Sequence, residues 1–270
     1  MGIRIAVQPR MGQYGKIVEM LRCVRGVECI ADVAAADGVI TDDLVWLKQS
    51  DGRDQFALLL SPFQVDAGCL GDFAASEKVV PAMQARSQPR VRQIKSEIDA
   101  GNLGQPGLLR SHDWDRSYAL DDQRLAENLD VAVWYFDQLP SVIYAVSRRN
   151  YVQMHLGFEG DGMAILDVDA GDSLGGSYQS LHLIGSRGAA YSDDHENVQL
   201  AIDARGIEAV PTPQGDAAWV NMLRAFYEVI RSGDSQQSEW RYVIEINRLV
   251  GAVHRSVAQQ RPITLESGNG

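Results

Sequence analysis

Two carboxylates and an indole have a spacing that puts them on one side of a helix. Glu127, Asp130 and Trp134 lie three and four residues apart, so in a helix they share a face. The opposite face would then be the core-facing one, with Leu125, Leu129, Ala132, Val133 and Phe136. Two carboxyl groups one turn apart shift each other's pKa and can transfer protons. The alternative interpretation is that acidic residues early in a helix favour its dipole and simply face water.

A second candidate lies in the turn Arg10-Met-Gly-Gln-Tyr-Gly15, which follows an apolar run. In the dinucleotide fingerprint G-x-G-x-x-G, the first glycine makes a tight turn. The second lets the backbone approach a pyrophosphate, and the third packs helix on strand. Arg10 occupies the first position, whereas Gly12 and Gly15 fill the other two, and Asp32 stands about where a ribose-binding carboxylate is expected. The pattern predicts Gly12, Gly15 and Asp32 as cofactor-binding residues, with an ordinary strand–helix turn as the alternative.

The histidines do not have metal-site spacing. His112 lies near Asp113 and Asp115, and the run Asp193-Asp-His195 is similar, but neither group has a second histidine at ligand distance. His155 and His182 fall in strand patterns, where we expect ordinary sheet residues. We therefore predict no metal site.

Alternating strand-like and helix-like segments would position the first candidates. Strands are expected over residues 3–7, 27–31, 38–41, 56–60 and 79–85, with helices over 12–23, 44–49 and 69–78. This alternation favours a parallel sheet covered by helices. A helix that opens at Pro89 and stops at Gly101 and Gly104 ends this part of the chain.

After residue 106 the pattern changes to strands joined by glycine-rich turns. Seven strands are expected, over residues 108–113, 141–146, 152–158, 163–168, 178–184, 198–202 and 207–210. Several alternate polar and apolar residues, which is typical of an antiparallel sheet with one covered face. One helix, over 124–136, carries the carboxylate pair, and two amphipathic helices over 218–231 and 240–257 follow. We expect two lobes, residues 1–106 and residues 107–270.

Composition restricts the partners. The chain has 270 residues, 45% hydrophobic and 23% charged, which are globular values. Asp+Glu 36 against Lys+Arg 25 gives a net charge of −11, which argues against nucleic acid and anionic lipid as partners. Three cysteines without a CxxC motif, and no long apolar run, lead us to expect a cytoplasmic protein with no membrane partner.

Several segments resemble the glucose–fructose oxidoreductase/inositol dehydrogenase (Gfo/Idh/MocA) family. The run Met83-Gln-Ala-Arg-Ser-Gln-Pro89, with the helix and Gly101-Asn-Leu-Gly104 after it, is similar to the family's strand, Asn/Arg turn, Pro-started helix and glycine exit. The runs Leu156-Gly-Phe-Glu-Gly-Asp-Gly162 and Ile184-Gly-Ser-Arg-Gly188 look like two family hairpins. The order and spacing of these motifs extend over residues 55–265.

The resemblance implies a fold and an activity. The fold would be α/β: a shortened Rossmann-like parallel-sheet domain followed by an α+β domain with a large, mainly antiparallel open sheet. The activity would be hydride transfer between NAD or NADP and a sugar, polyol or related hydroxy compound. The family also implies substrate contacts at Gln84 and Arg86, a ring contact at Trp134, and a homo-oligomer formed through the C-terminal sheet. For Arg86, a surface guanidinium at a strand end is the alternative.

The chain departs from the family at its chemistry. The family's Glu-Lys-Pro strand end aligns with Leu60-Ser61-Pro62, so Ser61 stands where a catalytic lysine is usual. From this alignment we expect Ser61 to be a cofactor-binding residue. The family's H-x-x-D-x-x-x-W helix motif aligns with Glu127, Asp130 and Trp134, so Glu127 replaces the histidine. Only about 55 residues precede the lysine position, where a full Rossmann lobe needs about 90, so one strand–helix unit is expected to be missing or reduced.

Three interpretations follow from these departures. The first is an unusual oxidoreductase that uses Glu127 and Asp130 for proton transfer. The second is a non-catalytic relative that serves as a ligand-binding or oligomerisation module. The third is a non-redox enzyme that uses the same two carboxylates.

Overall fold

The structure is a computed structural model, and it forms two compact units. It describes residues 2–8, 11–49, 54–65, 67–115, 119–171, 177–193, 198–203, 206–211 and 216–265. The first unit comprises Met1–Gln88 and Gly215–Glu245, and the second comprises Pro89–Gln214 and Ile246–Gly270. Each unit is described by itself below. The expected division into functional domains after residue 106 stays a prediction.

The first unit is built on a parallel five-stranded sheet of order β2-β1-β3-β4-β5. Its strands are β1 (Ile3–Val7), β2 (Val27–Ile30), β3 (Gly38–Thr41), β4 (Phe56–Leu59) and β5 (Val79–Pro81). Short apolar runs such as Gly-Val-Ile-Thr form these strands because both faces of a parallel sheet are buried. The order corresponds to positions 2-1-4-5-6 of the Rossmann order 3-2-1-4-5-6, so the described residues contain no counterpart of the edge strand 3. The described sheet therefore has the reduced form expected from the sequence.

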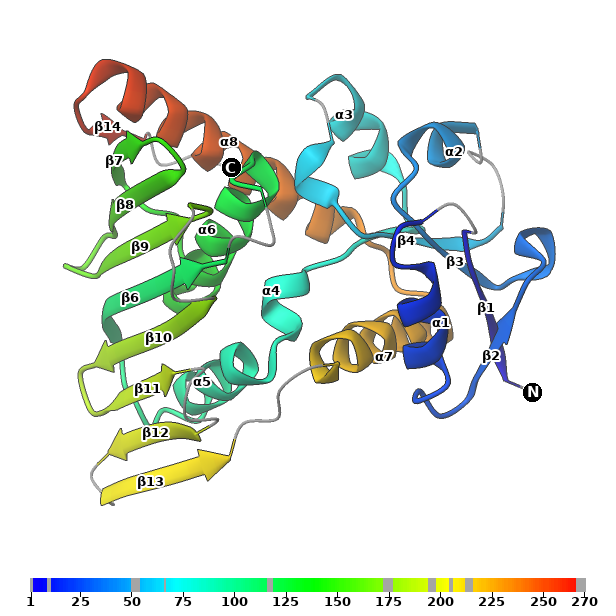
Figure 1. Cartoon of the computed structure of the whole chain (residues 1–270), viewed down its shortest axis with the longest axis horizontal. Coiled ribbons are helices and arrows are strands. Elements are labelled where there is room, and N and C mark those ends of the chain that lie inside the picture. The colour runs from blue at the N-terminus through cyan, green and yellow to red at the C-terminus, as the bar shows by residue number, and fades with distance from the viewer. Residues whose placement is uncertain are drawn as a thin grey trace. The chain divides into compact units, whose positions relative to one another are not determined.

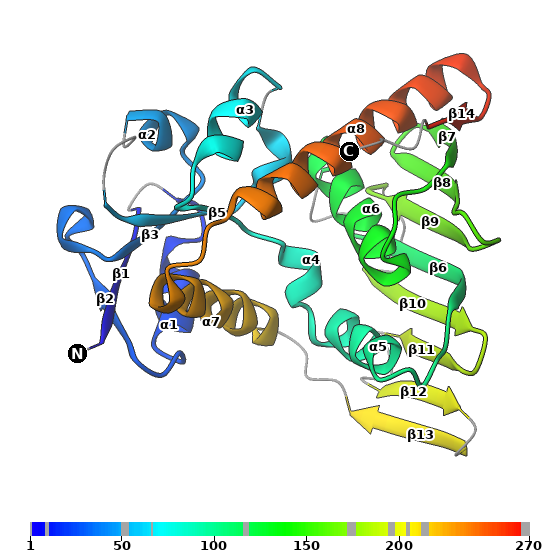
Figure 2. The same ribbon diagram turned by 180° about the vertical axis from the view of Figure 1, so that it is seen from behind.

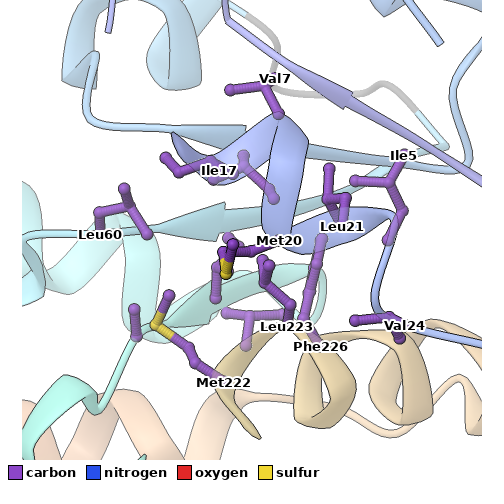
Figure 3. Packing of buried hydrophobic residues seen from close by; sticks show 14 of the residues in the cluster. Ile5, Val7, Ile17, Met20, Leu21, Val24, Leu60, Met222, Leu223 and Phe226 are labelled. Atoms are coloured by element: carbon purple, nitrogen blue, oxygen red, sulfur yellow. The ribbon is translucent and has the colours of Figure 1, made fainter. Parts of the chain in front are cut away.

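Helices join and cover these strands (Figures 1 and 2). They are α1 (Tyr14–Leu21), α2 (Leu44–Gln49), α3 (Ala67–Ala75), α4 (Gln84–Ser87) and α7 (Ala217–Ser232), together with the 3-10 turns η1 (Val33–Ala35) and η2 (Pro62–Gln64). The chain returns to this unit through α7, whose Met222, Leu223 and Phe226 are buried. Figure 3 shows these three side chains packed with Ile17 and Leu21 of α1. The expected amphipathic stripe of α7 thus closes the core of the parallel sheet.

The predicted strand over residues 79–85 is wrong beyond Pro81. The strand ends there, and Gln84–Ser87 form the short helix α4. Ala82 still donates its backbone N–H to the Leu59 carbonyl, but the Gln84 side chain then bonds the Leu60 carbonyl. The segment is apolar because it is buried, and Ala82 is only 1% exposed. Burial, not an extended backbone, explains its composition.

The second unit contains a nine-stranded sheet of order β13-β12-β11-β10-β6-β9-β8-β7-β14. The strands are β6 (Pro106–Trp114), β7 (Val142–Arg148), β8 (Tyr151–Gly157), β9 (Met163–Asp169), β10 (Tyr178–Gly185), β11 (Ala189–Asp193), β12 (Val198–Asp203), β13 (Gly206–Pro211) and β14 (Ile263–Thr264). Only β6 and β9 pair in parallel; the other neighbours are antiparallel. The mainly antiparallel sheet is therefore confirmed. Strands β11 and β14 had not been expected.

Helices cover one face of this sheet (Figures 1 and 2). They are α5 (Pro89–Asp99), α6 (Asp122–Phe136) and the part of α8 (Gln237–Gln259) that belongs to this unit. The predicted core face of α6 is buried, with Leu129 and Ala132 at 0% exposure. Tyr135 of α6 donates its hydroxyl to the Val91 carbonyl of α5 over 2.9 Å. No described helix is long and apolar enough to cross a membrane.

The motifs that carried the family resemblance contact one another in this unit. After α5, Leu103 and Gln105 accept backbone hydrogen bonds from Arg187 and Ser186 of the β10–β11 hairpin. A Cβ on Gly185 would collide with the Leu103 carbonyl oxygen, so the two loops approach as closely as a glycine allows. The glycines at these positions follow from that contact.

Candidate functional site

The parallel sheet has a topological switch point between β1 and β3. The chain leaves β1 for β2 on one side, and it then crosses to β3 on the other side of β1. In open α/β sheets, ligands bind outside the carboxyl ends of the strands at such a point. Gln8 follows β1 and Thr41 ends β3, and both side chains are buried. The Thr41 hydroxyl donates to Oε1 of Gln8 over 2.9 Å and accepts from the Asp43 N–H.

Sequence reasoning missed Gln8 and Thr41. Each is a polar residue at the carboxyl end of an otherwise apolar strand, which is a usable signal in hindsight. Their hydrogen bond joins two neighbouring strands at the switch point, so it fixes where the β1 and β3 loops begin.

Gly12 and Gly15 lie where the chain enters α1. Among the described residues, a Cβ at either position would meet no atom within 4 Å beyond its chain neighbours and the backbone of its own helix, so no described packing contact requires either glycine. For Gly12 this is open space of the kind that a pyrophosphate needs. The same space around Gly15 differs from the fingerprint, whose third glycine packs helix closely on strand, and the cofactor role of Gly15 stays a prediction. Arg10 lies outside the described residues.

The amino end of α1 has no side-chain cap. Gln13 precedes the helix without a capping hydrogen bond, and the first turn has no acidic residue. Its N–H groups are therefore not engaged by a side-chain cap, which suits an anion at this end of the helix.

Asp32 lies two residues after β2, at the same edge of the sheet. Its Oδ1 accepts a hydrogen bond from the Ala34 N–H over 2.9 Å and so caps η1. The side chain is exposed, and Oδ2 does not take part in this bond. The carboxylate is held in one orientation, with one oxygen left for another donor.

Ser61 and Gln84 follow the next two strands of this edge. Ser61 is half-buried after β4, and its side chain makes no capping bond to η2. Gln84 follows β5 and donates Nε2 to the Leu60 carbonyl over 2.6 Å. The side chain of Gln84 thus ties α4 to the end of β4.

Arg86 stacks on an aromatic ring of its own unit. The guanidinium carbon lies 4.3 Å from the centre of the Tyr242 ring, a cation–π distance. This contact fits the alternative interpretation of Arg86 as a guanidinium held by the protein surface.

Helix α6 is fixed to the second sheet by a buried ion pair. Asp121 caps the helix by accepting from the Arg124 N–H over 3.0 Å. The Arg124 side chain, 5% exposed, donates Nε to Oδ2 of Asp113 on β6 over 3.0 Å. It also donates to the Asp113, Asp115 and Asp169 carbonyls. Sequence reasoning missed this role of Arg124, since a lone arginine after two aspartates carries no pattern.

Hydrogen bonds complete the surroundings of the Asp113 carboxylate. Asn128 donates to Oδ2 over 3.0 Å, and Gln179 donates to Oδ1 over 2.7 Å. Burial alone would raise the pKa of Asp113, but the hydrogen bond and charge of Arg124 outweigh it, and the pKa is lowered. Asp113 is therefore a charged residue of β6 that holds Arg124, and its negative charge acts on Glu127 of α6.

Glu127 and Asp130 do not face open water. Asp130 is 1% exposed, and Glu127 is half-buried. Gln123, one turn earlier, donates Nε2 to Oε1 of Glu127 over 2.7 Å. Burial raises the pKa of Glu127 to about 7; the negative charges of Asp113, Asp130 and Asp121 add to the rise, and the Gln123 bond opposes it. A carboxyl with this pKa exchanges its proton near neutrality.

Trp134 continues the same face of α6. Its ring is half-buried, and the Lys95 ammonium of α5 lies 5.6 Å from the ring centre. Lys95 also pairs with Asp99 over 3.1 Å. The Trp134 ring thus already makes a cation–π contact with Lys95.

The structure therefore groups the predicted residues in two sets. Glu127, Asp130 and Trp134 share one face of α6 in the second unit. The first unit holds the others, which lie after strands of the parallel sheet or in the turn into α1: Gly12, Gly15, Asp32, Ser61, Gln84 and Arg86.

Within the described residues, no group of three or more His, Cys, Asp or Glu side chains could hold a metal ion. His112 instead lies with its Nδ1 3.0 Å from Oδ2 of Asp167, an ion-pair distance without hydrogen-bond alignment. Residues 194 and 195 of the other histidine run lie outside the described residues.

Solved structures with the same fold are known, although the sequence alone finds no relative. No family model matches the chain, and no curated protein sequence matches it. An oxidoreductase from Agrobacterium radiobacter, crystallised with NAD+, L-tartaric acid and magnesium, superposes with a TM-score of 0.79 over 98% of each chain, at 12% identity. A myo-inositol dehydrogenase from Corynebacterium glutamicum gives 0.79 over 99% of this chain and 100% of its own, at 16% identity.

The chain has the fold of the Gfo/Idh/MocA-type oxidoreductases. A myo-inositol 2-dehydrogenase from Lactobacillus plantarum also matches, with a TM-score of 0.74 over 98% of this chain and 100% of its own, at 12% identity. The Gfo/Idh/MocA fold thus accounts for both sheets of the chain. At these identities the comparison establishes the fold alone.

Proposed function

We propose that this protein is an NAD(P)-linked oxidoreductase that acts on a hydroxyl group of a sugar, a polyol or a related compound. Glu127 would transfer the proton, with Asp130 beside it, in place of the lysine and histidine that are usual in the family. The proposal is supported by the Gfo/Idh/MocA fold and by the neighbour crystallised with NAD+. The observation that carries it is Glu127, whose pKa of about 7 lies where a proton-transfer group needs it.

Three features of the first unit fit a dinucleotide. No described residue fills the space at the Cβ position of Gly12, Gln13 makes no side-chain cap at the amino end of α1, and Asp32 offers a fixed, exposed carboxylate after β2. These residues would receive the pyrophosphate at the helix end and a ribose hydroxyl at the carboxylate. A bound nicotinamide would supply the hydride acceptor or donor. Titration with both NAD(H) and NADP(H) distinguishes the two cofactors.

Glu127 then has a defined task. When the substrate hydroxyl is oxidised, its proton has to leave, and a carboxylate with a pKa near 7 accepts it at neutral pH. Oε1 of Glu127 is held by Gln123, so the second carboxyl oxygen, Oε2, is the one offered to the substrate. Burial, together with the negative charges of Asp113, Asp130 and Asp121, keeps the pKa of Glu127 high enough for the proton to be returned in the reverse reaction.

Ser61, as a cofactor-binding residue, and the substrate-binding residues Gln84, Arg86 and Trp134 also take part in the proposed function. Ser61 contributes a neutral hydroxyl where a relative has an ammonium, so it can donate a hydrogen bond but not supply a positive charge. Gln84 still offers its amide oxygen after donating Nε2 to Leu60. Arg86 and Trp134 are already stacked with Tyr242 and Lys95, so they would present the remaining surface of those pairs to a sugar-like ligand.

The proposed partners are a small hydroxy compound and a second copy of the chain, without nucleic acid or membrane. The nine-stranded sheet of the second unit is the surface through which the copies would associate. A cytoplasmic location is proposed with it.

The test is NAD(P)-linked turnover with a panel of sugars, polyols and hydroxy acids from pH 5.5 to 9. We expect kcat for oxidation to rise with pH through about 7, and Glu127→Gln to remove this limb and lower kcat by about 10²–10⁴-fold. Glu97→Gln is the matched control, because Glu97 on α5 accepts from Gln93 one turn earlier, as Glu127 does from Gln123. Turnover that is unchanged in Glu127→Gln would contradict the assigned role.

Two observations favour the non-catalytic alternative. Gly15 lacks the close packing of the fingerprint, and Gln84 and Arg86 are engaged by the protein itself. A ligand-binding relative, or a non-redox enzyme using Glu127 and Asp130, would bind hydroxy compounds without a nicotinamide cofactor. Substrate binding without cofactor binding is the result that would favour it.

A further inference from the structure

The second face of the nine-stranded sheet has side chains suited to a partner. Along β6, Leu109, Ser111 and Asp113 point to the helices, so Arg110, His112 and Trp114 point the other way. We call the surface formed by these three residues and their register neighbours on adjacent strands the outer sheet face. Figures 1 and 2 show α5 and α6 on the opposite face.

Apolar side chains gather on the outer sheet face. Eight large hydrophobic residues are exposed in the described chain, and six of them lie here: Trp114, Val146, Met163, Ile184, Leu200 and Ile207. Ile207 is 72% exposed and Met163 is 50% exposed. Such a gathering of exposed apolar side chains marks an interaction surface.

Charge points to a second copy as the partner. The chain carries −11 overall, yet the outer sheet face holds Arg110 and Arg148 beside Asp167, Asp169 and Asp193, which nearly balance. Two copies of an acidic protein repel least where their surfaces are locally neutral. A two-fold interface must also be complementary to itself, and a patch with both signs meets this condition.

Histidines lie at the centre of this face. His182 of β10 is directly opposite Arg110 of β6 and Tyr191 of β11 in the sheet register, and the centres of the His182 and Tyr191 rings are 5.3 Å apart. His112 lies beside Trp114, with ring centres 5.5 Å apart, and has the Asp167 carboxylate at 3.0 Å. A protonated His112 thus has a counter-charge at its ring, whereas His182 faces a guanidinium.

We propose that the outer sheet face binds the same face of a second copy while His182 is neutral, and that protonation of His182 separates the copies. The proposal rests on the self-association proposed above and adds its regulation. A charged imidazole opposite Arg110, buried between two copies, would place two positive charges side by side away from water.

The sign of the pH dependence follows from the groups around His182. Burial lowers its pKa, His112 and Arg110 lower it further, and Asp193 opposes them. Asp193 accepts a hydrogen bond from the Tyr178 hydroxyl over 2.9 Å, so that hydrogen bond already uses part of its negative charge. Association buries His182 more deeply and lowers its pKa again. Association therefore releases protons and weakens as the pH falls through the lowered pKa of His182.

The test is sedimentation velocity of the full-length protein at pH 7.5 and pH 5.5, with circular dichroism to confirm folding. We expect a dimer whose Kd rises by about 10-fold or more at pH 5.5, since each copy loses one neutral imidazole. His182→Gln is uncharged at both pH values and should keep the dimer at pH 5.5. His254→Gln is the matched control, because His254 pairs with Asp122 on the helical side and should leave the wild-type dependence intact.

The outcomes separate the two proposals. A monomer at every pH would overturn both the self-association and its regulation. A dimer with equal Kd at both pH values, or a His182→Gln dimer that still dissociates at pH 5.5, would overturn the regulation while the self-association stands.

Discussion

Glu127 is a carboxyl group whose ionised form is disfavoured in the folded protein. The helix places it among the charges of Asp113, Asp130 and Asp121 and takes it partly out of water, so the pKa rises to about 7. The only opposing hydrogen bond among those that shift this pKa comes from Gln123. Ionisable groups with a pKa shifted in this way tend to be functional, because a pKa shift that disfavours the charged form lowers the stability of the folded protein.

That cost gives a stability prediction for Glu127→Gln. The folded-state pKa of Glu127 is raised from 4.5, so its favourable contribution is present below about pH 4.5 and lost as the pH rises to about 7. The fully developed cost is roughly 3 kcal/mol. Urea unfolding should show Glu127→Gln close to wild type at pH 4.5 and more stable at pH 8.

The control for this prediction is again Glu97→Gln, whose stability relative to wild type should not follow the same curve. A difference between Glu127→Gln and wild type that is identical at pH 4.5 and pH 8 would mean that the pKa of Glu127 is not raised.

At this scale the sequence predicted the right face of α6 but not its environment. Spacing alone placed Glu127, Asp130 and Trp134 together, because helical periodicity is local. Burial is not local: helical spacing does not show that Asp130 is 1% exposed, and Asp113 comes from a strand 14 residues before Glu127. The contacts of Arg86 and Gln84 likewise depend on Tyr242 and Leu60, which no pattern joins to them.

The elements were largely predictable because their signals are local. The strands Ile3–Val7 and Gly38–Thr41 and the helix Leu44–Gln49 have the predicted bounds. Strand β11, Ala189–Asp193, was missed because Ala-Ala-Tyr-Ser-Asp has weak strand preference, and its pairing with β10 and β12 decides its conformation. The strand β5 was predicted too long, because the apolar sequence continues past Pro81 although the backbone does not stay extended there.

The contact between the α5 exit and the β10–β11 hairpin can be tested at Gly185. A Cβ there would collide with the Leu103 carbonyl oxygen and would come within 3.2 Å of the Gln105 carbonyl oxygen. Backbone atoms cannot move aside as side chains do, so Gly185→Ala should lower the free energy of unfolding by about 2 kcal/mol or more.

Gly107→Ala provides the comparison in the neighbouring strand. Its Cβ would lie 3.4 Å from the Ile184 carbonyl oxygen, an ordinary contact, so urea unfolding should show little change. Equal effects of the two substitutions would contradict the close approach at Gly185.

For the whole molecule, the order of strands and helices along the chain predicted the two kinds of sheet, but it did not predict how all the elements pack together. Alternation of strands and helices predicted the parallel sheet, and glycine-linked strands predicted the mainly antiparallel one. The return of α7 to the core of the first unit was not foreseen, since its apolar stripe does not say which sheet it covers. The parallel pairing of β6 with β9 is likewise a matter of topology.

The central claim is that the first unit binds a nicotinamide dinucleotide at the end of β1. Calorimetric titration with NAD(H) and NADP(H) tests it most directly, using wild type, Gly12→Val and Gly15→Ala. Because a Cβ at either glycine meets none of the described residues within 4 Å beyond its chain neighbours and its own helix backbone, both variants should fold, and Gly12→Val should block the space needed by the pyrophosphate.

The account predicts micromolar binding of at least one cofactor to wild type and to Gly15→Ala, with at least a 10-fold loss for Gly12→Val. Absence of binding at millimolar cofactor, or binding unaffected by Gly12→Val, would contradict it. The first result would leave a dehydrogenase fold that binds ligands without redox chemistry, and the second would place the cofactor elsewhere.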